Sequence, residues 1–564
     1  MNLSKLTTGS LLALMLAASP ARAELKLPAI FGDHMVLQRH GPIPVWGWAD
    51  AGENVVVTAG GATAKATAGP DGKWMAKLPN LKASATPIDV VVSGKINTLI
   101  FHDVVVGDVW LCGGQSNMEF NTGRAGNGAE ALLKASHPEI RFFEVAKHWV
   151  PFKPQTVCQG TWQICTPATA KKFSAVGYFF AEQIAAAQKI PMGMIGSAVP
   201  GSMAQPWISV EPLLADPALE KKYAQGYQRL SENFDALKVA HDQWQKQFGD
   251  DYKKALGQYW PLRAKARQAG EPDPVPPKPP TTREPFFPRP PSAFFNGMIA
   301  PIIPYALKGV LWYQGESNAG DDLYYKLFPA LIRDWRSRWG QGDFPFLFVQ
   351  LPNFSPRTKE PCQKKDGRDS GWVVVREAQL ETLKTVPNTG MAVTIDVGDA
   401  GNLHPPDKID VANRLVRLAR HIAYGEDLVF SSPIYDSFKI DGDKAQIKFK
   451  HAGTGLKIGS PPPTAIKPIP TAVPGGVASP PSAPSAASMP PAAELKGFAI
   501  AGADKKFVWA NAIIESPDTI SVWCDEVKRP VAVRYGWAEN PEVNLYNSED
   551  LPASPFRTDF PATH

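Results

Sequence analysis

The chain has 564 residues, of which 44% are hydrophobic and 20% charged, and its net charge of +5 is the difference between 59 basic and 54 acidic residues. A chain of this length exceeds what one hydrophobic core supports, so about three domains are expected. The composition excludes a disordered chain, and the lack of any long basic block excludes nucleic acid as an expected partner.

The first residues have the pattern of a secretory signal peptide. Lys5 supplies a positive charge, residues 11–18 form a short apolar run, and residues 21–23 read Ala-Arg-Ala, an A-x-A cleavage signal. We therefore expect residues 1–23 to be removed, leaving Glu24 as the mature N-terminus of a periplasmic or extracellular protein. A short uncleaved anchor is the alternative. No later stretch is long and apolar enough to span a membrane.

Three regions with different patterns follow. Residues 24–105 carry short alternating or β-branched runs separated by Gly, Asp and Pro turns, which predict a small β-sandwich. Over residues 106–425, apolar runs that end in glycine or polar residues alternate with helical stretches. Buried parallel strands alternating with helices predict a doubly wound α/β domain. β-like runs return over residues 426–564 and predict a C-terminal β region.

Two segments interrupt this organisation. Residues 211–270 are charged and helical in pattern, and residues 271–293 are rich in proline, so the whole of 211–293 reads as an inserted helical hairpin with a tether. Such an insertion serves as a lid or as a dimer contact, and the sequence does not separate the two, nor does it set the oligomeric state. Residues 460–493 are so rich in Pro, Ala and Ser that we expect a disordered loop or linker.

Five cysteines are present, so at least one is unpaired within the chain. Cys158 and Cys165 are near enough in sequence to form a disulfide, whereas Cys112 lies in an apolar run and is expected to be a packed thiol. No CxxC or HExxH pattern occurs, so we expect neither a metal site nor a cofactor.

The segment WLCGGQSNMEF, residues 110–120, places Ser116 directly after two glycines at the end of an apolar run. A strand that ends at glycines and turns sharply leaves the next side chain exposed at the carboxyl end of the sheet, where α/β enzymes hold their reactive groups. Ser116 is therefore a candidate nucleophile. The alternative is an ordinary turn, because Gly, Ser and Asn are common turn residues.

Two further strand ends carry polar side chains that suit ester hydrolysis. WYQGESN supplies the amide groups of Gln314 and Asn318, and IDVGDAGNLHPPDK supplies His404. A serine nucleophile needs a base to take its proton and donors for the oxyanion, and these residues supply both. The alternatives are that His404 caps a loop and that Glu316 is an acidic residue at a helix start.

Four segments together resemble the sialate O-acetylesterase family of the SGNH hydrolase superfamily. They read GGQSNMEF, AFFNGMIAPIIPYALKGVLWYQGESNAG, TIDVGDAGNLHPPDK and PVAVRYGWAENPEVNLYNSEDLPASPFRT. The resemblance extends from about residue 25 to residue 560, is weakest over 211–293 and is absent from the proline-rich segment. It implies a secreted esterase whose catalytic domain is SGNH-like and whose C-terminal β region belongs to the same enzyme.

The resemblance also implies roles for individual residues. Ser116 becomes the nucleophile and His404 the general base, and the backbone N–H groups of Ser116 and Gly201 form the oxyanion hole. SGNH enzymes take a third oxyanion donor from an asparagine in a G-x-N pattern, but Ser317 occupies that place here. Gln314 or Asn318 must then substitute, and Gln314 is preferred because it is nearer to the strand end.

The acid that orients the histidine is missing from its usual place. SGNH enzymes place an aspartate three residues before the histidine, whereas this chain has Gly401. Asp396 and Asp399 lie just upstream, and we expect one of them, or a backbone carbonyl, to accept a hydrogen bond from the other imidazole nitrogen. Loop capping is the alternative role for both aspartates.

The function implied is hydrolysis of acetyl esters on sugars, most simply of a 9-O-acetylated sialic acid, through a serine acyl-enzyme without metal. The partner expected is thus an O-acetylated sugar or glycan, contacted through Trp207, Trp312 or Tyr313 unless these aromatics belong to the core. One alternative is a deacetylase of xylan or another polysaccharide. A second is a noncatalytic carbohydrate-binding protein.

Overall fold

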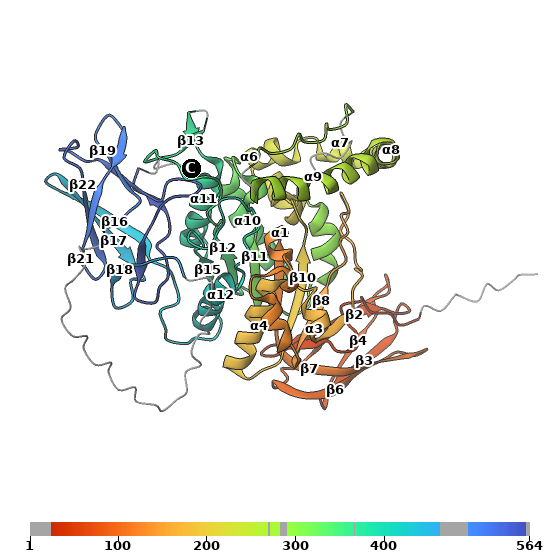
Figure 1. Ribbon diagram of the computed structural model, residues 1–564. Coiled ribbons are helices and arrows are strands. Elements are labelled where there is room, and N and C mark those ends of the chain that lie inside the picture. Colours follow the sequence, from red (N-terminus) through yellow and green to blue (C-terminus); the bar gives the residue numbers. More distant parts are fainter. Residues whose placement is uncertain (1–23, 269–270, 283–289, 366, 463–493, 560–564) are drawn as a thin grey trace, which may run out of the picture.

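The structure is a computed structural model that describes residues 24–268, 271–282, 290–365, 367–462 and 494–559. The expected signal peptide and nearly all of the expected linker at 460–493 lie outside the described residues. Three parts follow one another along the chain: an N-terminal β region, a central α/β region and a C-terminal β region (Figure 1).

The N-terminal part is β-rich, as predicted, and its short strands pair antiparallel, except that β1 pairs parallel with β7. In β3, Val55, Val57 and Ala59 are buried at every second position, as the alternating sequence requires. β2 pairs with β5, while β3 pairs with both β4 and β6. The strands are β1 (Val36–Gln38), β2 (Ile43–Trp48), β3 (Asn54–Ala59), β4 (Ala62–Thr67), β5 (Lys73–Leu78) and β6 (Ser84–Ser93).

The strand β7 (Thr98–Gly114) belongs to both the first and the second part. Its first half alternates between exposed and half-buried residues and pairs with β6, whereas every residue from Val104 onward is buried. Its second half is the central strand of the α/β sheet. The boundary predicted between residues 105 and 106 thus lies inside one continuous strand, and no linker separates the two parts.

The central sheet has the order β15-β12-β11-β7-β10-β8-β9. All neighbours in it are parallel except β9, which pairs antiparallel with β8 at the edge. This confirms the predicted parallel α/β domain. The remaining strands are β8 (His137–Glu144), β9 (Trp162–Cys165), β10 (Met192–Ala198), β11 (Gly309–Tyr313), β12 (Phe346–Val349) and β15 (Thr389–Ala392).

Helices cover both faces of this sheet. On one face α4 packs against α12, and on the other α10 packs against α11. The first pair of helices shares a hydrophobic core with β7 and β10, and the second pair contributes to a separate core. The helices of this part are α1 (Ser116–Glu119), α2 (Gly128–Leu133), α3 (Pro167–Ala170), α4 (Ala175–Gln188), α10 (Tyr324–Trp339), α11 (Gly371–Thr385) and α12 (Ile409–Ile422).

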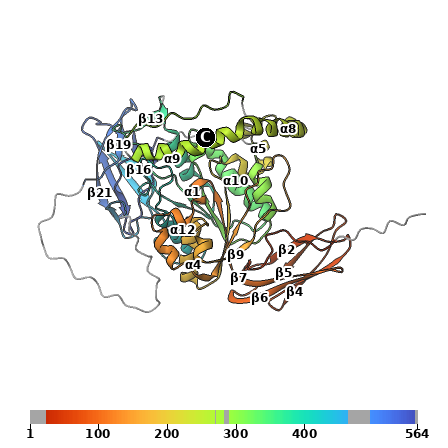
Figure 2. The same cartoon turned by 45° about the vertical axis from the view of Figure 1, so that its right-hand side comes forward.

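The predicted insertion is helical, and its longest helical stretch contains no reversal. α8 (Phe234–Trp244) passes into a π-helical turn, Gln245–Gly249, and then into α9 (Asp250–Gln268), with right-handed helical backbone at both junctions. The segment therefore continues in one direction, and Figures 1 and 2 show α8 and α9 along the side of the molecule on which α1 lies. It is preceded by α5 (Val210–Ala215), α6 (Pro217–Leu219) and α7 (Tyr227–Glu232).

The C-terminal part is a β region, as predicted, and its strands pair antiparallel. One sheet has the order β16-β17-β22-β21 and another the order β20-β19-β23-β25, and β18 pairs with β24. A short antiparallel pair, β13 (Lys364–Lys365) and β14 (Arg368–Asp369), lies between β12 and β15 of the central sheet in the sequence. The strands are β16 (Ile434–Asp441), β17 (Lys444–Lys450), β18 (Leu456–Ile458), β19 (Phe498–Ala501), β20 (Phe507–Trp509), β21 (Asn511–Ser516), β22 (Thr519–Trp523), β23 (Ala532–Tyr535), β24 (Leu545–Asn547) and β25 (Phe556–Arg557).

All five cysteines are free thiols in this structure, so the disulfide considered between Cys158 and Cys165 is not formed. Cys165 ends β9, where its side chain is buried and its sulfur approaches the carbonyl of Ala135. Cys112 is fully buried in β7, and burial raises the pKa of its thiol far above the usual value. Cys112 is therefore a packing residue, as expected.

Candidate active site

Ser116 lies where β7 ends and α1 begins. Gly114 has a φ of +131°, and a Cβ atom at this position would lie 2.2 Å from the carbonyl oxygen of Tyr313, so the close approach of β7 to β11 requires glycine. Gln115 N–H then donates to the same Tyr313 carbonyl at 3.0 Å. The chain turns sharply from strand to helix at this point, and the turn presents Ser116 at the carboxyl end of the sheet.

His404 lies in the loop between β15 and α12, and its Nε2 atom is 2.8 Å from Oγ of Ser116. Burial lowers the pKa of His404, and the nearby positive charges of Lys408 and Arg124 lower it further. A neutral imidazole can accept a proton at Nε2 when Nδ1 carries the hydrogen. The two residues thus form a nucleophile and base pair at hydrogen-bonding distance.

The loop that follows β10 brings Gly201 to the same edge of the sheet. Val199 N–H donates to the carbonyl of Gly114 at 3.1 Å, which fixes the start of this loop beside the Ser116 turn. Gly201 has a φ of +67°. Among the described residues, neither the N–H of Ser116 nor that of Gly201 has a protein acceptor. Both donors are therefore available for an oxyanion.

The expected third oxyanion donor is not found at Gln314 or Asn318. The amide nitrogen of Gln314 donates to Ser202 O at 3.2 Å and to Asn318 Oδ1 at 2.7 Å. The amide nitrogen of Asn318 donates to Gln205 Oε1 at 3.3 Å and to Asp321 Oδ2 at 2.9 Å. Each amide group has two hydrogens, so both are fully used inside the protein. These two residues instead fix the loop that carries Gly201.

Neither Asp396 nor Asp399 orients His404. Asp396 forms a buried ion pair with Arg414, at 2.6 Å and 2.8 Å between its two oxygens and the two terminal nitrogens. Asp399 is exposed and accepts a hydrogen bond from Gly401 N–H at 2.8 Å, which is the loop-capping role. Among the described residues, no side chain or carbonyl accepts from Nδ1 of His404. The expected aspartate partner is therefore absent from this structure.

The three candidate sugar-stacking aromatics belong to the core. Trp207, Trp312 and Tyr313 are all fully buried, and the rings of Trp207 and Trp312 meet edge to face at 6.1 Å. A buried ring has no face to offer a sugar, so the expectation that these residues contact substrate is not met.

Sequence reasoning missed a buried polar cluster beside Ser116. Asn117 donates to Glu316 Oε1 at 2.5 Å, and Lys408 donates to Asn117 Oδ1 at 2.7 Å. Glu316 had been considered only as a helix-start acid, and Lys408 lies in a proline-containing loop where a lysine is usually exposed. The sequence offers one indication only: Asn117, Glu316 and Lys408 lie inside the segments that supply the candidates Ser116, Gln314 and His404.

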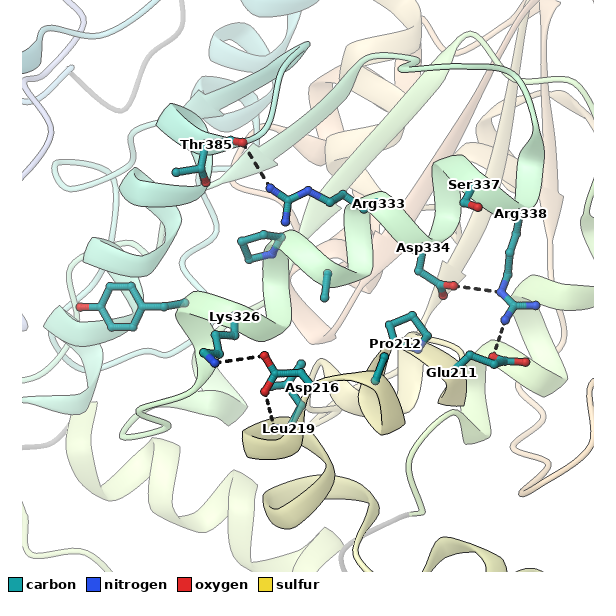
Figure 3. A pocket seen from close by; sticks show the side chains of 14 residues that line it. Glu211, Pro212, Asp216, Leu219, Lys326, Arg333, Asp334, Ser337, Arg338 and Thr385 are labelled. Atoms are coloured by element: carbon teal, nitrogen blue, oxygen red, sulfur yellow. Dashed lines mark hydrogen bonds and ion pairs between the residues drawn. The ribbon is translucent and has the colours of Figure 1, made fainter. Parts of the chain in front are cut away.

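A hollow of about 920 Å³ lies elsewhere, between α5, α6 and α10 (Figure 3). Most of its charged side chains pair with each other, Lys326 with Asp216 at 3.0 Å and Arg338 with Asp334 at 2.9 Å, while Arg333 donates to the Thr385 carbonyl at 3.3 Å. None of the predicted catalytic residues lines it. Its paired charges give no indication of a ligand.

Two searches of the described residues were negative. No group of three or more His, Cys, Asp or Glu side chains in that part of the chain could hold a metal ion. Nor does any helix in the same ranges have the length and apolar character needed to cross a membrane.

Comparison with known proteins identifies relatives of the chain. A family model described as "Carbohydrate esterase, sialic acid-specific acetylesterase" matches residues 106–240 and 294–417. The two matched ranges contain Ser116, His404 and Gly201, and they leave out most of the long insertion helix.

Curated relatives extend the similarity beyond the central domain. The sialate O-acetylesterase of Mus musculus is 31% identical over 443 residues, which cover 71% of this chain and 74% of the relative. That of Homo sapiens is 29% identical over 486 residues, covering 79% and 80%. Among solved structures, a carbohydrate acetylesterase from Xanthomonas citri is 34% identical with a TM-score of 0.71, and the match covers 95% of this chain and 100% of that one.

Proposed function

Since the chain belongs to the sialate O-acetylesterase family, and is an esterase, we propose that it removes acetyl groups from sugars through a serine acyl-enzyme. The observation that carries this proposal is the 2.8 Å contact between Ser116 Oγ and His404 Nε2. Ser116 begins α1 and His404 lies in the loop before α12, so two separate segments meet at the carboxyl end of the sheet. A serine held against an imidazole in this way is the arrangement that nucleophilic ester hydrolysis needs.

The proposed reaction has two steps. In the first, Ser116 Oγ attacks the acetyl carbonyl carbon while His404 Nε2 takes the serine proton, and the same proton then passes to the sugar oxygen as the ester bond breaks. In the second, water loses a proton to His404 and attacks the acetyl-serine, after which the proton returns to Ser116 as acetate leaves. The lowered pKa of His404 keeps the imidazole neutral, and so ready to act as the base, at neutral pH.

The oxyanion of each tetrahedral intermediate is assigned to the N–H groups of Ser116 and Gly201. Both lack a protein acceptor among the described residues, which supports the assignment. Two backbone donors of this kind stabilise the charge that develops in the transition state without reorganising. Membership of the SGNH superfamily is part of the proposal, although Gly401 and Ser317 depart from the usual pattern.

We assign the natural substrate to acetylated sugars that carry a carboxylate, of which a 9-O-acetylated sialic acid is the leading example. Arg124 supports this assignment. It is exposed, its guanidinium stacks 4.6 Å above the ring of Phe120, and among the described residues no carboxylate pairs with it. Its loop is tied to the His404 loop, because Gly126 N–H donates to Pro406 O at 3.0 Å. An unpaired arginine beside the reacting pair suits an anionic sugar better than neutral xylan.

Export to the periplasm or the medium is also proposed, on the pattern of residues 1–23. N-terminal sequencing of the protein purified from the periplasm and from the medium tests it, since cleavage exposes Glu24. An intact N-terminus in the membrane fraction would point to the uncleaved anchor instead.

Acetate release from a panel of substrates tests the proposed function. The panel contains 9-O-acetylated sialic acid, acetylated xylan and p-nitrophenyl acetate, each with the wild type and with Ser116→Ala. Release from the sialic acid by the wild type alone supports the proposal, and preference for xylan would indicate a polysaccharide deacetylase. Equal, near-background release by both proteins would indicate a noncatalytic carbohydrate-binding protein.

A further inference from the structure

Lys408 is a fully buried lysine four residues after His404, immediately before α12. Its ammonium group donates to Asn117 Oδ1 at 2.7 Å and lies over two aromatic rings, 4.9 Å from that of Phe120 and 5.4 Å from that of Tyr313. Lysine is almost never fully buried unless it is paired, because desolvating its charge is costly. Packing alone therefore does not account for a lysine at this position.

The partner of Lys408 is the residue next to the nucleophile. Asn117 uses both ends of its amide: Oδ1 accepts from Lys408, while Nδ2 donates to Glu316 Oε1 at 2.5 Å and to the carbonyl of Leu403 at 3.1 Å. Asn117 is fully buried, so these contacts are shielded from water. One side chain thus joins α1, the end of β11 and the loop that carries His404.

Lys408 and two acceptors together fix which way this amide points. An ammonium group only donates hydrogen bonds, so Oδ1 of Asn117 must face Lys408. Nδ2 must then face the other side, where Glu316 and the Leu403 carbonyl both accept. Without Lys408, the buried Oδ1 would have no donor among the described residues, and Asn117 would be held less firmly against the Leu403 carbonyl.

The Leu403 carbonyl matters because His404 has no acid to hold its ring. In this structure the loop is held through its backbone, by Asn117 on Leu403, by Asn402 Oδ1 on the N–H of His404 at 2.9 Å, and by Gly126 on Pro406. The charged groups that act on His404 are Lys408 and Arg124, and Glu316 and Asp407 act in turn on Lys408. The cluster of Lys408, Asn117 and Glu316 therefore affects both the position and the pKa of His404.

We infer that Lys408 is a positioning residue for the hydrolysis, acting through Asn117 to hold His404 against Ser116. The inference rests on the proposed function, since it needs Ser116 and His404 to be the reacting pair. It assigns to a lysine and an asparagine the orienting task that an aspartate performs in a complete triad.

Lys408→Met tests the inference, with Lys439→Met as the matched control because Lys439 is an exposed lysine in the C-terminal sheet. Lys408→Met should lower kcat by about 10- to 100-fold, as a misplacement of about 1 Å does, with little change in KM. Removing a positive charge should also move the acidic limb of the kcat/KM profile to higher pH. Lys439→Met should change neither quantity.

A double-mutant cycle with Asn117→Leu shows whether Lys408 acts on His404 through Asn117. If Lys408 acts through Asn117, the double variant should lose about as much kcat as Asn117→Leu alone. The double variant leaves no unpaired lysine, but it still removes the donor of Glu316 and of the Leu403 carbonyl, so kcat is compared per folded molecule in all variants. Circular dichroism and thermal unfolding of each variant report the folded fraction.

Each outcome decides a separate question. Wild-type kcat and an unshifted pH profile in folded Lys408→Met overturn the inference, and so do losses that multiply in the double variant. Inactivity of both the wild type and Lys439→Met on p-nitrophenyl acetate would instead overturn the proposed function.

Discussion

The carboxylate of Asp396 pairs with the guanidinium of Arg414, and only 1% and 7% of the two side chains are exposed. Tyr546, from the C-terminal part, also donates to Asp396 at 3.3 Å. These contacts join the segment after β15 to α12 and to β24. Asp396 therefore fixes the start of the loop that carries His404, and its carboxylate has no contact with the imidazole.

Asp396→Asn should reduce stability more than it reduces the rate. Removing one partner of a buried ion pair leaves the other charge uncompensated and costs about 3 kcal/mol in the free energy of unfolding. Because Asp396 does not contact His404, kcat of the folded protein should stay within a few fold of the wild type. Urea unfolding and kcat on p-nitrophenyl acetate measure the two effects.

Asp399→Asn is the matched control, since the exposed amide keeps an oxygen for Gly401 N–H and should change neither quantity. A loss of kcat of roughly 10⁴-fold in Asp396→Asn without a loss of stability would show that Asp396 does serve the histidine.

Ser116→Ala should keep the fold and lose at least roughly 10³-fold in kcat, because the acyl-enzyme cannot form without the hydroxyl. The variant removes a single oxygen at the start of α1, so thermal unfolding should match the wild type. Near-normal turnover in the folded variant would show that another group carries the acetyl.

The pH profile of kcat/KM should rise through an apparent pKa below the histidine reference value of about 6.5. Burial and the charges of Lys408 and Arg124 all lower the pKa of His404, so its neutral, basic form persists to lower pH than that of an exposed histidine. Initial rates from pH 4.5 to 8 measure the profile. A midpoint above about 7, or activity in His404→Ala, would contradict the role of His404 as the base.

Arg124→Met should weaken hydrolysis of 9-O-acetylated sialic acid by about 10- to 100-fold in kcat/KM while leaving p-nitrophenyl acetate nearly unaffected. A charge-assisted contact to a carboxylate is worth about 1.5–3 kcal/mol, and the neutral ester cannot use it. Rates are compared at pH 8, where His404 is neutral with or without the positive charge. Lys134→Met, at the C-cap of the neighbouring α2, controls for a general change in surface charge. Equal losses on both esters would show that Arg124 does not recognise the substrate.

The central sheet could be predicted because its strands are near-continuous apolar runs that end in glycine or polar residues. Ser116 and His404 could be placed at one edge because the carboxyl ends of parallel strands meet there. The boundary predicted between residues 105 and 106 lies within β7, where only the change in burial from Val104 onward marks the passage between sheets.

The partners of buried polar groups could not be predicted in the same way. Asp396 and Arg414 are 18 residues apart, and nothing in their spacing tells an ion pair from a catalytic acid. Lys408 and Asn117 meet only after α1 and the loop before α12 are packed together. Nor does the sequence reveal the π-helical turn at Gln245–Gly249 through which α8 continues into α9.

Gln314→Met distinguishes the two roles considered for Gln314, which are support of the loop that carries Gly201 and donation to the oxyanion. In this structure its amide supports Ser202, Asn318 and, at 2.9 Å, the hydroxyl of Tyr324. Leaving such buried groups unsatisfied costs about 1–3 kcal/mol each, so urea unfolding should show a clear loss of stability. Since the amide does not face the oxyanion, kcat of the folded fraction should fall by less than about tenfold. Removing an oxyanion donor instead costs about 10²- to 10³-fold in kcat with the fold intact. That result would show that Gln314 donates to the oxyanion.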